Sequence, residues 1–87
     1  ESMTSYEFLL KGKENTLKPV RIKGEGMSYC YDLTTMSFTK VFNNSEMYIL
    51  PMKLPDKDKV CIYVPNIYGT GTLLRVNKED IEYLGLN

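Results

Sequence analysis

Short runs that alternate between apolar and polar side chains recur along this chain of 87 residues. A period of two is typical of a β-strand with one face on a core and the other in water. Turn-forming glycine, asparagine and proline separate the runs at intervals of about 8–12 residues, as in small antiparallel barrels and sandwiches. We expect strands over residues 6–10, 17–23, 27–32, 37–42, 47–50, 60–64 and 72–76.

The connections between these runs are too short to contain crossover helices, which favours antiparallel pairing. Residues 33–36 have the length of a four-residue hairpin loop. In the most apolar run, Val60, Ile62 and Val64 form the expected core face and Cys61 points the other way.

One short helix of about two turns is predicted at the C-terminal end, between Asn77 and Gly85. Asn77 is a favourable N-cap, and Glu79 and Asp80 fall in the first turn, where the helix dipole favours acids. Gly85 suits the C-terminal cap.

These elements predict an all-β fold, or a β-rich α+β fold. The expected architecture is a small antiparallel, partly open barrel or sandwich of six to seven short strands with a short C-terminal helix. Strand count and spacing resemble those of SH3-like and OB-like barrels. The length suits one domain over residues 3–87. Glu1 and Ser2, ahead of Met3, are interpreted as a cloning remnant.

Histidine and tryptophan are both absent, whereas tyrosine occurs seven times. Without histidine the chain lacks the commonest acid–base catalyst near neutral pH and the commonest metal ligand. Two cysteines are too few for a structural zinc site, and a catalytic thiol usually needs a neighbouring base. We therefore predict no enzymatic activity, no cofactor and no metal. Cys30 and Cys61 are expected to be buried or half-buried thiols, reduced as in a cytosolic protein.

The segment 68–72, Tyr-Gly-Thr-Gly-Thr, invites comparison with a phosphate-binding loop. It lies between two predicted strands and lacks the lysine and hydroxyl residue that follow in such loops. A hairpin loop that uses glycine for positive φ is the favoured interpretation. Tyr68 and Thr70 remain candidate contacts of this loop.

Aromatic and basic side chains gather on three consecutive predicted strands. Faces of this composition bind single-stranded nucleic acid, and they also form protein interfaces. In the alternative interpretation, Tyr29 and Tyr31 are partly buried core residues and the lysines are merely solvated. The candidate interaction face consists of Arg21, Lys23, Tyr29, Tyr31, Phe38 and Lys40.

The net charge is zero, which is atypical of a dedicated nucleic-acid-binding protein. We expect a non-catalytic protein-binding module, an inhibitory accessory protein that acts by surface occlusion. Lysine outnumbers arginine nine to two, a bias that suits an AT-rich phage or mobile element. The alternatives are a small barrel that binds single-stranded nucleic acid and a structural subunit that forms homo-oligomers through its strand edges.

No apolar run approaches the roughly 18 residues of a membrane-spanning helix, and no signal peptide is recognisable. The expected compartment is therefore the cytoplasm, with no membrane partner.

Overall fold

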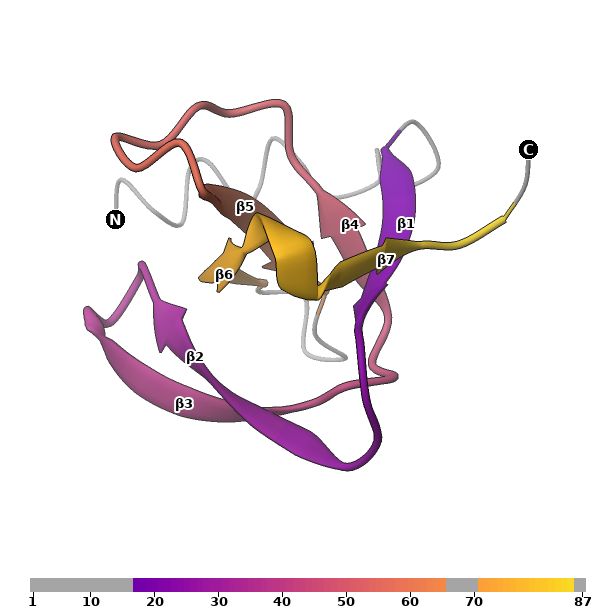
Figure 1. The fold of residues 1–87 in the computed structure, drawn as a ribbon. Coiled ribbons are helices and arrows are strands. Elements are labelled where there is room, and N and C mark those ends of the chain that lie inside the picture. Colours follow the sequence, from indigo (N-terminus) through magenta and orange to yellow (C-terminus); the bar gives the residue numbers. More distant parts are fainter. Residues whose placement is uncertain (1–16, 66–70, 86–87) are drawn as a thin grey trace.

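A computed structural model describes residues 17–65 and 71–85, which form one open antiparallel sheet (Figure 1). Its order is β3-β2-β6-β5-β4-β1-β7, so β3 and β7 are the edges among the described strands. The prediction of an all-β antiparallel domain is thereby confirmed. The strands are β1 (Lys18–Ile22), β2 (Met27–Asp32), β3 (Ser37–Phe42), β4 (Met47–Ile49), β5 (Lys59–Val64), β6 (Thr72–Asn77) and β7 (Ile81–Tyr83).

The expected strand over 6–10 and the residues interpreted as a cloning remnant, Glu1 and Ser2, lie outside the described residues. Within the described ranges, no helix has the length and apolar character needed to cross a membrane.

The described strands form a strongly curved sheet (Figure 1). Six of the seven described strands contribute to one apolar cluster. Ile62 and Leu74, at its centre, have no exposed surface. Burying a side chain of this size contributes roughly 1.5–3 kcal/mol. The cluster comprises Val20, Ile22, Cys30, Met47, Ile62, Leu74, Val76 and Ile81. Because it joins β2 and β6 to β1 and β7, it draws distant parts of the sheet together.

Strand β5 is buried on both faces, and Val60, Ile62 and Val64 face the main cluster as expected. Cys61, Ile62 and Tyr63 are at most 2% exposed, whereas Val60 and Val64 are only partly buried. The reason is that β5 lies inside the sheet, with the main cluster on one face and a second cluster on the other. Strands covered on both faces are apolar throughout, and residues 60–64 follow this pattern. The second cluster comprises Leu50, Cys61, Tyr63 and Leu73.

No C-terminal helix occurs in the described residues 78–85, and this prediction was wrong. Residues Lys78–Asp80 form a single 3-10 turn (η2), and the chain then continues as strand β7. The side chain of Asn77 makes no capping bond to the turn. A helix of about two turns is marginal by itself. Here pairing of β7 with β1, and burial of Ile81 opposite Ile22, favour the extended conformation.

The β2–β3 hairpin has the predicted bounds, with pairs running from Met27↔Phe42 to Asp32↔Ser37. Its loop covers residues 33–36. The Asp32 carboxylate accepts the backbone N–H groups of Thr34, at 2.8 Å, and Thr35, at 3.3 Å. Local hydrogen bonds of this type favour a tight turn, so the hairpin closes on its own short-range contacts.

Strand β3 has a neighbour, β2, on one side only among the described strands. The N–H of Asn43 donates to the carbonyl of Gly26 at 2.9 Å and continues the β2–β3 ladder. Hydrogen-bonded and non-hydrogen-bonded pairs alternate along an antiparallel ladder. Counting back from Asn43, Thr39 and Val41 therefore direct their backbone polar groups toward β2.

The intervening residues Phe38, Lys40 and Phe42 direct their N–H and C=O groups away from β2, at the edge that no described strand pairs with; we call this the free edge. This register predicts an alternating pattern of amide hydrogen exchange in β3. We expect the amides of Thr39 and Val41 to exchange at least about tenfold more slowly than those of Phe38 and Lys40. Exchange measured residue by residue by NMR tests this, and uniform protection across residues 38–42 would contradict it.

Candidate binding surface on the β2–β3 hairpin

Three cross-strand pairs form the outer face of the β2–β3 hairpin, and we call this surface the hairpin face. Successive side chains of a strand point to opposite sides, so alternate positions share a face. Tyr29, Phe38 and Phe42 are 69%, 66% and 62% exposed. On the inner side, Cys30 belongs to the main apolar cluster and anchors the hairpin. The hairpin face consists of the pairs Met27↔Phe42, Tyr29↔Lys40 and Tyr31↔Phe38.

Ring contacts order the side chains of the hairpin face. The rings of Tyr31 and Phe38 meet edge to face, with centroids 5.2 Å apart. The ammonium of Lys40 lies 5.8 Å from the centroid of the Tyr29 ring. On the other side of Tyr31, the guanidinium of Arg75 lies over the ring at 4.3 Å. Such cation–π contacts contribute about 0.5–2 kcal/mol and hold aromatic rings and cations in fixed relation.

A groove of about 430 Å³ runs beside the hairpin face, between β2, β6 and η2. One of its cations, Lys59, donates to the side-chain oxygen of Asn77, whose amide donates to Asp80 at 3.2 Å. The groove thus has an aromatic wall and a polar wall of mixed charge. Its aromatic and basic lining consists of Tyr29, Tyr31, Phe38, Lys23, Lys59 and Arg75.

Arg75 and Lys23 make no ion pair within the part of the chain that the structure describes. Arg75 is partly buried and fixed on Tyr31, while Lys23 is exposed. A guanidinium offers five N–H donors in a planar fork that matches carboxylate and phosphate oxygens. The groove therefore presents a positioned guanidinium next to exposed aromatic rings, with Asp80 also in its lining.

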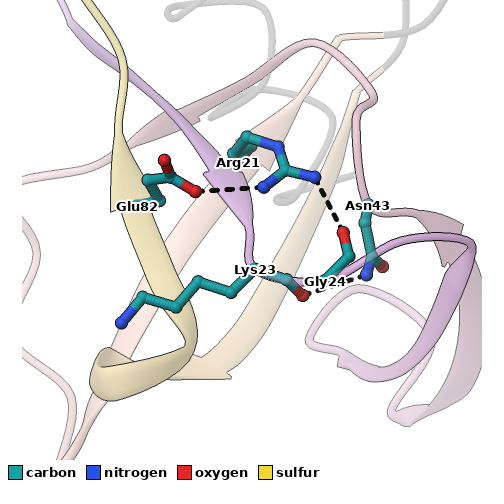
Figure 2. A network of polar contacts seen from close by, with 5 residues as sticks. All are labelled: Arg21, Lys23, Gly24, Asn43 and Glu82. Atoms are coloured by element: carbon teal, nitrogen blue, oxygen red, sulfur yellow. Dashed lines mark hydrogen bonds and ion pairs between the residues drawn. The ribbon is translucent and has the colours of Figure 1, made fainter.

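Arg21 has a different environment, as Figure 2 shows. Its guanidinium donates to the Glu82 carboxylate at 3.0 Å and to the Gly24 carbonyl at 2.7 Å. These bonds tie β1 to β7 and to the turn before β2. The Lys23 carbonyl accepts the Asn43 side-chain amide at 3.0 Å, and the Lys23 side chain extends away from this network. Arg21 thus has structural partners, whereas the Lys23 ammonium has no ion-pair partner among residues 17–65 and 71–85.

The structure brings four of the predicted site residues onto the hairpin face, and Lys23 lines the adjoining groove. The interpretation of Tyr29 as a core residue was wrong, because its ring is exposed; Tyr31 is half-buried. The four residues on the face are Tyr29, Tyr31, Phe38 and Lys40. The candidate loop contacts Tyr68 and Thr70 lie outside the described residues.

Sequence reasoning missed Arg75, the cation that lies over Tyr31. It reaches the site because β6 pairs with β2, with Tyr31 directly opposite Arg75. That pairing joins segments more than forty positions apart, and nothing local encodes it. A signal was nevertheless present, since Arg75 is the single charge in the apolar run of residues 72–76.

Gly71, at the end of the glycine-rich segment, has a packing role in the described structure. A Cβ atom at this position would collide with the ring of Tyr63, which is buried in the second cluster. The close approach of that ring explains a glycine here without a bound phosphate.

Cys30 and Cys61 are free and buried, as the sequence analysis predicts. Burial raises the pKa of the Cys61 thiol to about 11. Burial, together with the nearby charge of Asp80, also raises the pKa of Cys30. Both thiols are therefore protonated and weakly nucleophilic at neutral pH. No group of three or more cysteines, aspartates and glutamates with metal-binding geometry occurs in the described residues.

Searches against protein-family models, curated proteins and solved structures each returned no match.

The raised pKa of Cys61 predicts a loss of stability at alkaline pH. The folded state holds the proton more tightly than the unfolded state, whose thiol titrates near 9.0. The stabilisation is therefore complete below pH 9 and is lost as pH rises toward 11, by at most about 3 kcal/mol. Urea unfolding gives the free energy of unfolding at pH 8 and at pH 11. Between these two pH values it should fall further for the wild type than for Cys61→Val. Equal decreases would contradict the assignment.

Proposed function

We propose that this chain is a non-catalytic protein-binding module that docks through the hairpin face. In this proposal it is an inhibitory accessory protein that acts by occluding a surface of its partner. The bias of nine lysines to two arginines supports a phage or mobile-element origin.

The concentration of exposed apolar side chains on one hairpin is the observation that supports the proposal. Eight large apolar side chains are exposed among the described residues, and five of them lie between residues 27 and 42. Contiguous exposed apolar surface of this kind marks interaction sites. Aromatic residues and methionine are also the types enriched at protein interfaces. The five are Met27, Tyr29, Met36, Phe38 and Phe42.

We infer that the curved sheet is a small, partly open barrel and that it acts as a rigid support for the hairpin. The main cluster, shared by β1, β2, β6 and β7, supports this inference. The ring contacts of Tyr31 with Phe38 and Arg75 order the face before a partner arrives. A preordered surface loses less conformational entropy on binding, which favours affinity.

A pull-down from host lysate tests the proposal with the variant Tyr29→Ser/Phe38→Ser. Both side chains are exposed, so the fold should persist while the docking surface loses its two most exposed rings. We expect one stoichiometric protein partner with the wild type, retained after nuclease treatment. The double variant should recover it at least about tenfold less, as for two interface anchors.

Tyr83→Ser is the matched control, since Tyr83 is an aromatic residue on β7 with 58% exposure and lies outside the hairpin face. Thermal melts establish that all variants fold. Undiminished recovery by the double variant would exclude the hairpin face as the docking surface.

Binding of single-stranded nucleic acid is the second candidate function, and the paired rings and cations favour it. Arg75 lies over Tyr31, Lys40 lies beside Tyr29, and Lys23 lines the same groove. Aromatic stacking platforms next to cations are how single strands are bound without sequence preference. Net charge zero and the acidic Asp80 in the groove make this candidate secondary.

Salt dependence of oligonucleotide binding tests this second candidate. Contacts from three cations to phosphates predict a slope of about −2 in log K against log salt for a single strand. Lys23→Glu/Lys40→Glu should abolish binding, whereas Lys57→Glu, in the turn before β5, should leave it nearly unchanged. Arg21→Glu is unsuitable here because it breaks the link to Glu82. A slope near zero would exclude phosphate recognition.

A further inference from the structure

The free edge of β3 offers a row of backbone groups that no described strand pairs with. The ladder register directs the N–H and C=O groups of Phe38, Lys40 and Phe42 toward this edge. These residues also belong to the hairpin face. The edge therefore combines unpaired hydrogen-bonding groups with exposed side chains, which is the arrangement that accepts an added strand.

Charge on the hairpin is confined to two residues. Asp32 is 8% exposed, and its carboxylate is engaged by the backbone of the hairpin loop. Lys40 is exposed and lies on the free edge, between Phe38 and Phe42 on the same face. The exposed pattern along the edge is therefore apolar, positive, apolar.

We propose that β3 binds an extended segment of a partner protein as an additional antiparallel strand. The segment has a carboxylate residue opposite Lys40 and apolar residues two positions to either side, opposite Phe38 and Phe42. Opposite charges that face each other across antiparallel strands contribute roughly 0.2–1 kcal/mol, and aromatic pairs contribute similarly. Main-chain hydrogen bonds supply affinity, and the side-chain pattern supplies selectivity. This inference rests on the proposed protein-binding function and specifies its mode.

A second copy of the chain fits this edge poorly. Two-fold pairing of β3 with itself, centred on Lys40, uses all three free positions but places the two lysines opposite each other. Like charges in that position are destabilising, and lysine on an edge strand is a common guard against self-pairing. If the two-fold axis passes through Thr39 or Val41 instead, the two lysines no longer face each other. In that register, however, only two of the three outward-directed residues of each copy find a partner. An acidic strand uses all three without repulsion.

Selection of displayed random peptides of about ten residues on the full chain tests the proposal. We expect a consensus with Asp or Glu flanked by apolar residues at both second neighbours. Lys40→Pro removes the central edge N–H, and proline is tolerated in an edge strand where its nitrogen faces outward. The variant should bind the selected peptides at least about tenfold more weakly than the wild type does. Lys40→Thr keeps that N–H and should abolish the preference for the acid.

Amide exchange provides a measurement that does not depend on the folding of a variant. Adding a selected peptide should slow hydrogen exchange at the amides of Phe38, Lys40 and Phe42. Exchange at the amides of Thr39 and Val41 should not change. The absence of any selected peptide, a consensus without the acid, or unchanged edge exchange would each overturn the proposal. So would a dimer of the wild type that Lys40→Pro dissociates, since the occupant would then be a second copy.

The pull-down separates this proposal from the broader one. If Tyr29→Ser/Phe38→Ser loses the cellular partner while Lys40→Pro retains it, docking on the hairpin face stands and strand addition is overturned. If neither variant loses the partner, both proposals fail.

Discussion

Two residue pairs, Tyr31↔Arg75 and Asp32↔Leu74, join the β2–β3 hairpin to the rest of the sheet. This short ladder places Arg75 over Tyr31 and brings β6 and η2 alongside β2, which creates the groove. The ladder occupies the edge of β2 that faces away from β3, so β3 remains at the edge of the described sheet. The hairpin face, the groove and the free edge all depend on this one junction, with Cys30 packing beneath it as a second anchor.

The junction also explains why so much apolar surface stays exposed. The inner face of the hairpin meets the core, but the outer face has no described layer above it, so Tyr29, Phe38 and Phe42 remain in water. Exposed apolar area contributes nothing to folding until a partner covers it. A chain of this size has little stability to spare, and this exposed aromatic surface is therefore the feature on which the proposal of a docking face rests.

Local patterns predicted the strands well and the helix badly. The bounds of β2 and β3 follow from alternation interrupted by a four-residue loop, because both signals lie within the hairpin itself. The predicted C-terminal helix rested on caps that each contribute about 1 kcal/mol. Those signals were outweighed by strand pairing with β1 and burial of Ile81, which are contacts with residues some sixty positions away. Along β5, the apolar run correctly indicated a strand, but not that both of its faces are buried.

The sequence by itself determined the all-β character, the β2–β3 hairpin, and the alternation that places Tyr29, Tyr31, Phe38 and Lys40 on one face. Short-range sterics and turn chemistry decide these features, and both are local. Only the tertiary structure decided that this face points to solvent and that Arg75 joins it, while Arg21 is engaged by Glu82 and Gly24. Those outcomes depend on which strands become neighbours, and that is set by how the whole chain buries its apolar side chains.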